Sequence, residues 1–216
     1  MGKGLFIVGT DTDVGKTLIS SIIVKNLKDS GVKVAYYKPV VSGGTCDMDF
    51  VKAFAGLKED ISYMNSYTME KPLSPHLASN IENITIESDL INKKFKSLME
   101  ENEVMVCEGA GGIKVPLNYD GLLIEDLVKD FNIPVIIVAR AGLGTINHTL
   151  ITIESLKRSN INIKGIVING YEEANICHID NKNTIKNLID EEILAVVPKV
   201  KDTNDLKNFK ILGGLI

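Results

Sequence analysis

A glycine-rich segment near the start of the chain has the residue types and spacing of a phosphate-binding loop. Gly9-Thr-Asp-Thr-Asp-Val-Gly15-Lys16-Thr17 follows an apolar run at residues 5–8 and leads into a pattern of helical period. Backbone N–H groups of such a loop, at the N-terminus of the next helix, can surround phosphate oxygens. The Lys16 ammonium can then reach the outer phosphates, and the Thr17 hydroxyl can bind Mg²⁺.

The spacing of this loop differs slightly from the common motif. Five residues separate Gly9 from Gly15, where the usual phosphate loop has four, and Thr10 stands where the first glycine usually does. The alternative interpretation is an ordinary strand–turn–helix joint capped by Asp or Thr. The apolar run before the loop and the helical pattern after it favour nucleotide binding.

Carboxylates follow two other predicted strands. Glu108 comes directly after the apolar run 104–107, where phosphate-loop enzymes commonly hold an acid of the Mg²⁺ site. The small residues at 109–112 come next, and they let the backbone approach a ligand closely. Asp47 and Asp49, in the connection after the second strand, could supply another carboxylate, although a helix N-cap is the more common role of one aspartate there.

Lys38 and Ser42 flank Pro39-Val-Val41 at the end of the second predicted strand. A lysine is most often a solvated surface charge. At a strand end beside the phosphate loop, however, the Lys38 ammonium would face the same phosphates as Lys16. Two lysines and a metal ion would neutralise a triphosphate together with an anionic nucleophile that attacks it.

These residues lie at the ends of strands that alternate with helices. Apolar runs predict strands at 5–8, 34–37, 104–107, 135–139, 166–168 and 194–197, and helical periods predict helices at 16–27, 90–99, 122–128 and 146–156. This alternation implies a parallel sheet with helices on both faces, and ligands of such a sheet bind at the carboxyl ends of its strands. We therefore predict one α/β domain over residues 1–216 that resembles the phosphate-loop NTPases, with a mostly parallel sheet. The connection at 40–85 is expected to be irregular, apart from a short helix at 49–55.

Composition excludes several classes of protein. The 216 residues include 24 Lys or Arg and 28 Asp or Glu, and the net charge of −4 disfavours nucleic acid or an anionic membrane as a partner. The longest apolar runs have five residues, too few to span a bilayer, and the first residues leave no room for a targeting peptide. Three separated cysteines form no disulfide framework or zinc motif, so a cytoplasmic protein is expected. His76 and His148 lack a second ligand at metal spacing.

Five blocks of sequence occur together in a specific order. They are Gly9-Thr-Asp-Thr-Asp-Val-Gly-Lys-Thr17, Tyr37-Lys-Pro-Val40 with Ser42-Gly43, Ser74-Pro-His76, Glu108-Gly-Ala-Gly-Gly112 and Leu143-Gly-Thr-Ile-Asn-His148. Together they resemble the dethiobiotin synthetases, an ATP-dependent family of biotin biosynthesis. The resemblance extends from residue 4 to about residue 200, and the extra residue of the phosphate loop belongs to the family pattern.

The resemblance implies a cytoplasmic, homodimeric ligase that acts on 7,8-diaminononanoate, CO₂ and MgATP. One amine would take up CO₂ to give a carbamate, whose oxygen would attack the γ-phosphate. The second amine would then close the ureido ring of the resulting carbamic-phosphoric anhydride and release phosphate.

The resemblance also implies roles for residues at the family's motif positions. Lys38 would be the catalytic lysine between the carbamate and the γ-phosphate, with Lys16 beside it. Mg²⁺ would be held by Thr17, Glu108 and an aspartate, for which we prefer Asp49 over Asp47 without deciding between them. The substrate would contact Thr12 and Ser42, and its carboxylate would lie near Asn147 of a partner subunit, at a helix N-terminus. The nucleotide would contact Asp13, Val14, Gly15, Lys16, Thr17 and Leu18 at its phosphates, Gly109, Ala110 and Gly111 after Glu108, and Asn169, Gly170, Pro198, Lys199 and Val200 around its base.

Two other classes of protein are weaker alternatives. Cobyrinate diamide synthases carry a glutamine-hydrolysing domain, for which this chain has no space. Switch ATPases of the ParA/MinD type usually place a second lysine inside the phosphate loop, and residues 10–14 contain none. The C-terminal segment 210–216 is also too short and too weakly basic for an amphipathic membrane anchor.

Overall fold

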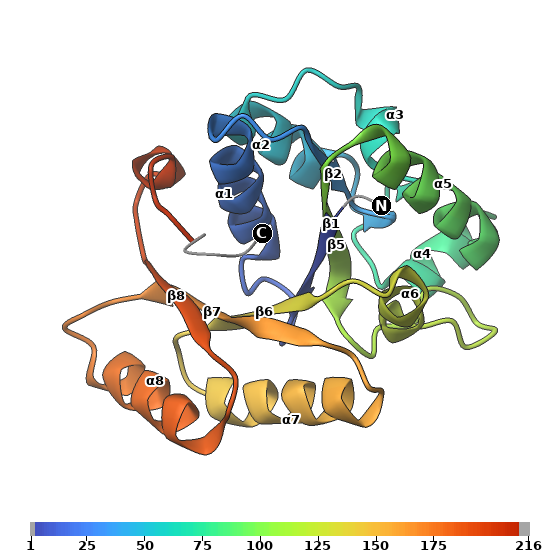
Figure 1. Cartoon of the computed structure of the whole chain (residues 1–216). Helices are drawn as coiled ribbons and strands as arrows, with labels where there is room; N and C mark the ends of the chain where they lie inside the picture. Colours follow the sequence, from blue (N-terminus) through green and yellow to red (C-terminus); the bar gives the residue numbers. More distant parts are fainter. Residues whose placement is uncertain (1–2, 212–216) are drawn as a thin grey trace.

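A six-stranded parallel sheet runs through the molecule in the strand order β2-β5-β1-β6-β7-β8 (Figure 1). The structure, a computed structural model, describes residues 3–211, so part of the C-terminal segment 210–216 lies outside the described residues. The strands of this sheet are β1 (Lys3–Gly9), β2 (Val34–Tyr37), β5 (Val104–Gly112), β6 (Val135–Arg140), β7 (Ile163–Tyr171) and β8 (Ile193–Pro198). Every pairing between them is parallel. The predicted α/β class and all six predicted strands are therefore confirmed.

Helices cover both faces of the sheet. They are α1 (Lys16–Asp29), α2 (Cys46–Ala55), α3 (Ile61–Met64), α4 (Pro75–Ile81), α5 (Ser88–Glu101), α6 (Ile124–Phe131), α7 (Thr145–Arg158), α8 (Ile176–Leu188) and a 3₁₀ turn at Thr203–Leu206. The helices α1 and α2 pack on one face, and α5, α6 and α7 pack on the other. In Figure 1, α7 and α8 lie side by side below β6, β7 and β8.

The core has two halves because successive strand residues point to opposite faces of the sheet. In β1, Phe6 and Val8 join the half under α5, α6 and α7, whereas Leu5 and Ile7 join the half under α1 and α2. All four side chains are buried. This burial on both faces explains why the central strand has a continuous apolar sequence rather than an alternating one.

The connection between β2 and α5 is more ordered than predicted. Val40–Ser42 (β3) and Tyr67–Met69 (β4) form a second, two-stranded parallel sheet, and the segment around Pro75, expected to be a loop, begins α4. Proline fits there because the first turn of a helix does not need its missing N–H. Helix α2 begins at Cys46 instead of Asp49, so both aspartates lie in its first turn.

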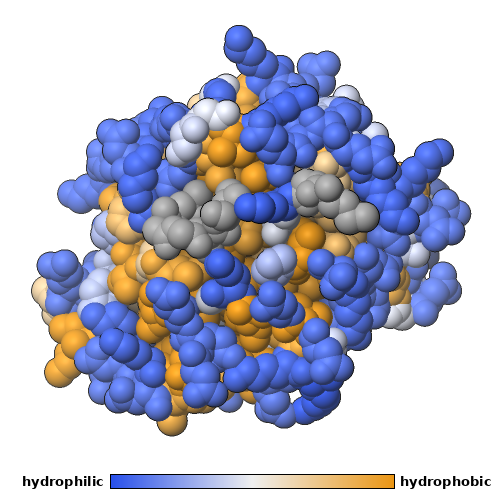
Figure 2. Space-filling model, in the orientation of Figure 1, coloured by the Kyte–Doolittle hydropathy of each residue, from blue (hydrophilic) through white to orange (hydrophobic). Residues whose placement is uncertain are grey.

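Helix α8 has no counterpart among the predicted elements. Three of its apolar residues, Ile176, Ile179 and Leu188, are exposed, so the helix lacks the regular apolar stripe that sequence reasoning looks for. Hydrophobic atoms are visible at the lower left of Figure 2, where Figure 1 places α8, while hydrophilic atoms cover much of the rest of that face. Among residues 3–211, no helix combines the length and the apolar character that crossing a bilayer requires.

Candidate active site

A cavity of about 770 Å³ opens at the carboxyl edge of the sheet, beside the ends of β1, β2 and β5. The sequence-predicted residues that line it are Thr12, Asp13, Gly15, Lys16, Thr17, Lys38, Ser42, Asp47, Glu108, Ala110 and Gly111. They come from four separate stretches of the chain, and the parallel sheet brings these stretches to one edge. This is the place where ligands of open parallel sheets bind.

The phosphate loop is held in a conformation that only glycine can take at residue 15. Gly15 has φ of 97°, and a Cβ atom there would lie 2.0 Å from Nδ2 of Asn169. The Asn169 side chain, at the end of β7, donates a hydrogen bond of 2.9 Å to the carbonyl oxygen of Val14. Asn169 is thus a support of the loop in this structure.

Lys16 is buried at the start of α1, and its Nζ donates a hydrogen bond of 3.2 Å to the carbonyl oxygen of Asp11 in the same loop. Burial lowers the pKa of the Lys16 ammonium, and the nearby Glu108 carboxylate opposes this shift by favouring the charged form. Asp11 in turn forms an ion pair with Arg140 at the end of β6. Sequence reasoning did not select this pair, because nothing in the sequence indicates that the two strand ends are neighbours.

Glu108 is the centre of the polar network in the cavity. Its carboxylate is fully buried, and Oε1 accepts hydrogen bonds of 2.8 Å from the Thr17 hydroxyl and 2.8 Å from Lys38 Nζ. The other oxygen, Oε2, accepts a hydrogen bond of 2.9 Å from the Tyr36 hydroxyl. Both oxygens of this buried carboxylate therefore accept hydrogen bonds from neighbouring side chains, as a buried polar group requires.

Lys38 is paired with two carboxylates. Its ammonium contacts Glu108 and also Asp47, whose side chain is 45% exposed. Burial by itself would lower the pKa of Lys38, but the negative charges of Glu108 and Asp47 outweigh it and hold the pKa above its usual value of 10.5. Lys38 is therefore a permanent cation, suited to binding anions and unsuited to acting as a base.

The alternation of side chains along strands explains why these groups meet. Tyr36 and Lys38 are two residues apart at the end of β2, so both point to the face that α1 covers. Glu108 follows Val106 by two residues in β5, and Tyr36 pairs in register with Val106. Tyr36 was not selected from the sequence, because its apolar neighbours make it look like a core residue. Its distance of two residues from Lys38 was the available signal.

The two aspartates of α2 have different surroundings. Asp47 contacts Lys38 and lines the cavity. Asp49 is exposed, lies outside the cavity lining, and accepts a hydrogen bond of 2.7 Å from the Thr45 hydroxyl. The geometry brings Asp47, and not the preferred Asp49, to Lys38.

Ser42 and Thr12, two residues predicted to contact the substrate, differ in burial. The Ser42 hydroxyl is buried at the wall of the cavity and has no hydrogen-bond partner among residues 3–211. A buried hydroxyl without a partner is costly, so a ligand that bonds to it would gain affinity. Thr12 is exposed at the mouth of the cavity.

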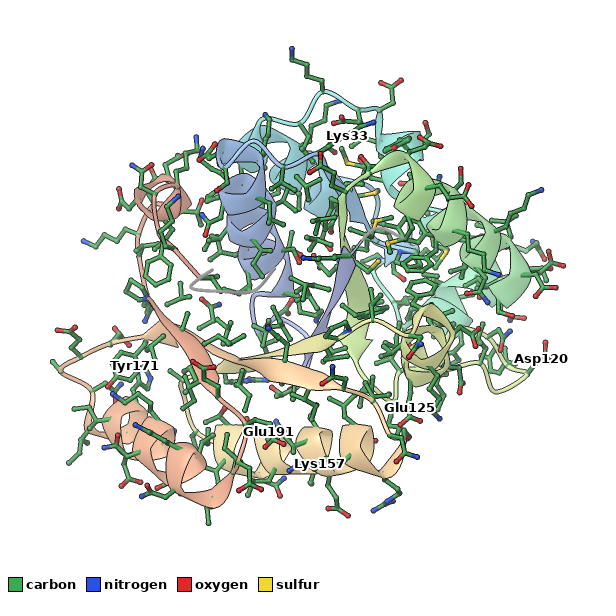
Figure 3. All side chains as sticks on the ribbon, viewed as in Figure 1. Lys33, Asp120, Glu125, Lys157, Tyr171 and Glu191 are labelled. Atoms are coloured by element: carbon green, nitrogen blue, oxygen red, sulfur yellow. The ribbon has the colours of Figure 1, made fainter. Side chains whose placement is uncertain are left out.

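The remaining predicted residues lie around the cavity or away from it. Leu18 is half-buried in α1, and Gly109 is buried within β5. Pro198 and Lys199 are exposed after β8, where Lys199 Nζ lies 3.4 Å from Glu172, and half-buried Val200 follows them. Gly170 and Tyr171, which is labelled in Figure 3, are the last two residues of β7, and Tyr171 pairs with Pro198 at the end of β8. Asn147 is exposed in the first turn of α7 and does not line the cavity.

The oxygen groups in the cavity fit a hard divalent cation that shares its coordination with a nucleotide. Glu108, Asp47 and the Thr17 hydroxyl are all oxygen donors, the type that Mg²⁺ prefers. Within residues 3–211, no group of three His, Cys, Asp or Glu side chains is placed to hold a metal ion by itself. Mg²⁺ usually takes only one or two protein carboxylates and completes its shell with water and phosphate oxygens, so this donor set suits it.

Comparison with known proteins identifies the family. A family model described as an AAA domain matches residues 3–207. The ATP-dependent dethiobiotin synthetase BioD of Clostridium novyi (strain NT) is 41% identical to this chain, over 97% of the chain and 93% of the relative. The protein of the same name from Brachyspira hyodysenteriae is 38% identical, over 91% of the chain and 92% of the relative. The chain belongs to the dethiobiotin synthetase family.

The fold of this chain is shared by proteins outside the family. In the MinC:MinD cell division protein complex of Aquifex aeolicus, a chain superimposes with a TM-score of 0.60, over 96% of this chain and 85% of that chain, at 14% identity. A likeness at this level of identity shows the fold alone. The assignment of this chain to its family therefore rests on the sequence relatives, and the phosphate-loop fold on both comparisons.

Proposed function

We propose that this member of the dethiobiotin synthetase family is an ATP- and Mg²⁺-dependent ligase that forms dethiobiotin from 7,8-diaminononanoate and CO₂. ADP and phosphate are the other products. The observation that carries the proposal is the contact of Lys38, Glu108 and Thr17 beside the phosphate loop, in one cavity. Lys38 can bind and neutralise anions, Glu108 and Thr17 offer oxygen atoms to Mg²⁺, and the reaction requires no nucleophile from the protein.

The reaction joins two amines through one carbon atom in three steps. An amine of the substrate adds to CO₂ and loses a proton, which gives a carbamate. A carbamate oxygen then forms a bond to the γ-phosphorus of ATP while the bond from that phosphorus to the β,γ-bridging oxygen breaks, and ADP leaves. The second amine forms a C–N bond to the carbonyl carbon, loses its proton, and displaces phosphate as the ring closes.

The two lysines act on the step that brings two anions together. Lys38 would contact both the carbamate and the γ-phosphate, and Lys16 would act from the phosphate loop; both lysines line the cavity, which supports these roles. Because Lys38 keeps its proton, it lowers the repulsion between the anions and stabilises the charge that develops during phosphoryl transfer.

The oxygen donors beside the lysines supply the metal site. Thr17 and Glu108 would hold Mg²⁺, directly or through water, and bound Mg²⁺ would neutralise phosphate charge. For the third donor we propose Asp47 in place of Asp49, because Asp47 lines the cavity and Asp49 bonds to Thr45 outside it.

The rest of the cavity accommodates the two organic ligands. Thr12 and Ser42 contact the diamine or its carbamate, a role that the unpartnered Ser42 hydroxyl supports. The phosphates lie along residues 13–18 and against residues 109–111. The adenine base lies near Asn169 and Gly170 at the end of β7 and near residues 198–200 after β8.

The active unit is a homodimer in this proposal. Leu143 and Ile151, at the start of α7 and along it, are 89% and 56% exposed. Ile151 lines a second cavity of about 500 Å³, between the phosphate loop and α7. A partner subunit on this face would cover the apolar side chains and could bring its own Asn147 to the substrate carboxylate. Light scattering, which measures the molar mass in solution, tests the proposed dimer. A monomer with full activity would contradict it.

The experiment that tests the activity is a phosphate-release assay with MgATP. We expect release that requires both bicarbonate and 7,8-diaminononanoate, with dethiobiotin formed in equal amount. ATP turnover that is indifferent to both compounds would contradict the synthetase activity and favour a nucleotide switch of the ParA/MinD type. Since ATP and reduced thiols are supplied in the cytoplasm, we place the reaction there.

A further inference from the structure

Tyr36 is a buried residue that contacts the reactive cavity only through Glu108. The tyrosine is 1% exposed, and its hydroxyl lies 2.9 Å from Oε2 of Glu108. It does not line the cavity, so it cannot touch a ligand there. The two oxygens of the Glu108 carboxylate therefore have different partners. Oε2 accepts a hydrogen bond from the Tyr36 hydroxyl, and Oε1 accepts hydrogen bonds from the Thr17 hydroxyl and the Lys38 ammonium.

The Tyr36 hydroxyl can serve only as a donor in this position. The 2.9 Å contact pairs the hydroxyl with an oxygen of the Glu108 carboxylate, and a carboxylate oxygen accepts hydrogen bonds. A carboxylate that is buried as completely as Glu108 needs a partner on each oxygen. Without the tyrosine, Oε2 would be free to turn toward Lys38 or Thr17, and Oε1 would lose its fixed direction.

We propose that Tyr36 is a positioning residue that holds Glu108 by Oε2 and so directs Oε1 toward Thr17, Lys38 and the divalent cation. The inference rests on the proposal that Glu108 belongs to the metal site. A hydrogen-bond partner of a metal-ligating group typically changes metal affinity or activity by about 10- to 100-fold when it is removed.

The same strand provides a matched control. Tyr37 is also fully buried, but it points to the opposite face of the sheet, where its hydroxyl bonds to Ser66 at 2.7 Å and to the carbonyl oxygen of Ile91 at 3.3 Å. Tyr36→Phe and Tyr37→Phe therefore remove the same buried group from adjacent positions, and only the first removal reaches Glu108.

The test measures Mn²⁺ binding to the ADP complex of the full-length protein by electron paramagnetic resonance, with turnover as a second readout. We expect Tyr36→Phe to weaken Mn²⁺ binding about 10-fold or more and to lower kcat by a similar factor, with a smaller change in KM for ATP. Tyr37→Phe should change both by less than about 2-fold. Equal Mn²⁺ affinity in Tyr36→Phe and the unchanged protein, or an equal loss in both variants, would overturn the proposal.

A second comparison separates the role of Tyr36 from that of Glu108 and from folding. Glu108→Gln removes the charge, so the double variant Tyr36→Phe/Glu108→Gln leaves no buried carboxylate unpaired and remains informative if Tyr36→Phe does not fold. We expect the double variant to bind Mn²⁺ like Glu108→Gln alone, since Tyr36 acts through Glu108. A further loss of about 10-fold would show an independent role and overturn the inference. If Glu108→Gln itself keeps full Mn²⁺ affinity, the metal-site proposal fails instead.

Discussion

Two buried glutamates, Glu108 and Glu125, have similar surroundings and different places in the fold. Glu108 is fully buried and Glu125 is 4% exposed. Glu125 lies 2.6 Å from Lys114 and 3.5 Å from Lys129, and it accepts hydrogen bonds from Ser155 at 3.3 Å and Ser159 at 2.7 Å. Each carboxylate thus has lysine and hydroxyl partners.

The difference lies in what surrounds the partners. Glu125 is on α6 and its partners link α6 to the end of α7, as the labelled side chain in Figure 3 shows between these helices. Lys114, in the loop after β5, and Lys129, on α6, are about half-exposed, while Ser155 and Ser159 connect Glu125 to the end of α7. Glu108 ends an apolar run in β5, and its partners Thr17 and Lys38 line the cavity. Burial and hydrogen bonding of the carboxylate are therefore common to Glu125 and to Glu108, the proposed metal-site residue. Position at the carboxyl edge of the sheet distinguishes them.

The largest expected effect comes from the lysine partners of the two glutamates. Lys38→Leu should lower turnover by about 1,000-fold, since it removes a cation that stabilises the transition state, and ATP binding should change much less. The matched variant Lys129→Leu removes a lysine from Glu125 and should leave turnover within about 2-fold of the unchanged protein. Steady-state kinetics and calorimetric ATP binding measure both. Near-normal turnover of Lys38→Leu would remove Lys38 from its role.

The next largest effect is expected when the two glutamates themselves are replaced and the Mg²⁺ dependence of turnover is compared. Glu108→Gln should lower turnover by about 100-fold and raise the Mg²⁺ concentration needed for half-maximal rate, because it weakens a metal-binding group. Glu125→Gln should leave the Mg²⁺ titration of the rate unchanged. If the two variants respond alike to Mg²⁺, the distinction between a functional and a structural carboxylate is wrong.

Glu125 should instead affect stability and its dependence on pH. Burial alone would raise the pKa of Glu125, but Lys114, Ser159 and the other donors lower it to about 2, below the usual 4.5. A lowered pKa in the folded state stabilises the protein above about pH 4.5, and this contribution is lost as the pH falls toward about 2. Glu125→Gln should therefore cost on the order of 2 kcal/mol in the free energy of unfolding at pH 7, and the cost should shrink from pH 5 to pH 3.

Urea unfolding at several pH values measures this effect. Glu154→Gln is a control, because Glu154 forms an exposed pair with Arg158 and should change stability by less than about 0.5 kcal/mol. A cost for Glu125→Gln that does not depend on pH would contradict the ion-pair explanation.

The smallest effect concerns the exposed acids near Glu108. Asp47→Asn should lower turnover by about 10-fold, since Asp47 contacts Lys38 and lines the cavity. Asp49→Asn should have little effect on turnover, because the Asp49 side chain bonds to Thr45 and lies outside the cavity lining. The same kinetic assay ranks them, and a larger loss in Asp49→Asn would restore Asp49 as the metal-site acid.

Features that depend on local sequence were predictable. Gly15, Lys16 and Thr17 are adjacent in the chain, and their loop needs only a strand before it and a helix after it. Continuous apolar runs predicted the six strands of the main sheet, since strands buried on both faces are mostly apolar.

Two kinds of feature were not predictable: the direction in which a side chain points around its helix, and contacts between residues far apart in the sequence. Each residue of a helix turns the side-chain direction by about 100°, so the start of α2 at Cys46 decides which aspartate faces Lys38. Tyr36 looks like any apolar strand residue until β2 is placed beside β5. The α8 helix was not predicted because its exposed isoleucines interrupt the regular apolar stripe.

The sequence by itself determined the family and the fold class and predicted which residues would bind phosphate, because these properties follow from residue type and short spacing. Only the tertiary structure decided which acid lies beside Lys38, which tyrosine supports Glu108, and that Glu125 is a structural carboxylate. Those outcomes depend on distances between side chains on different elements. Such distances are set by strand order and helix rotation, which no local pattern encodes.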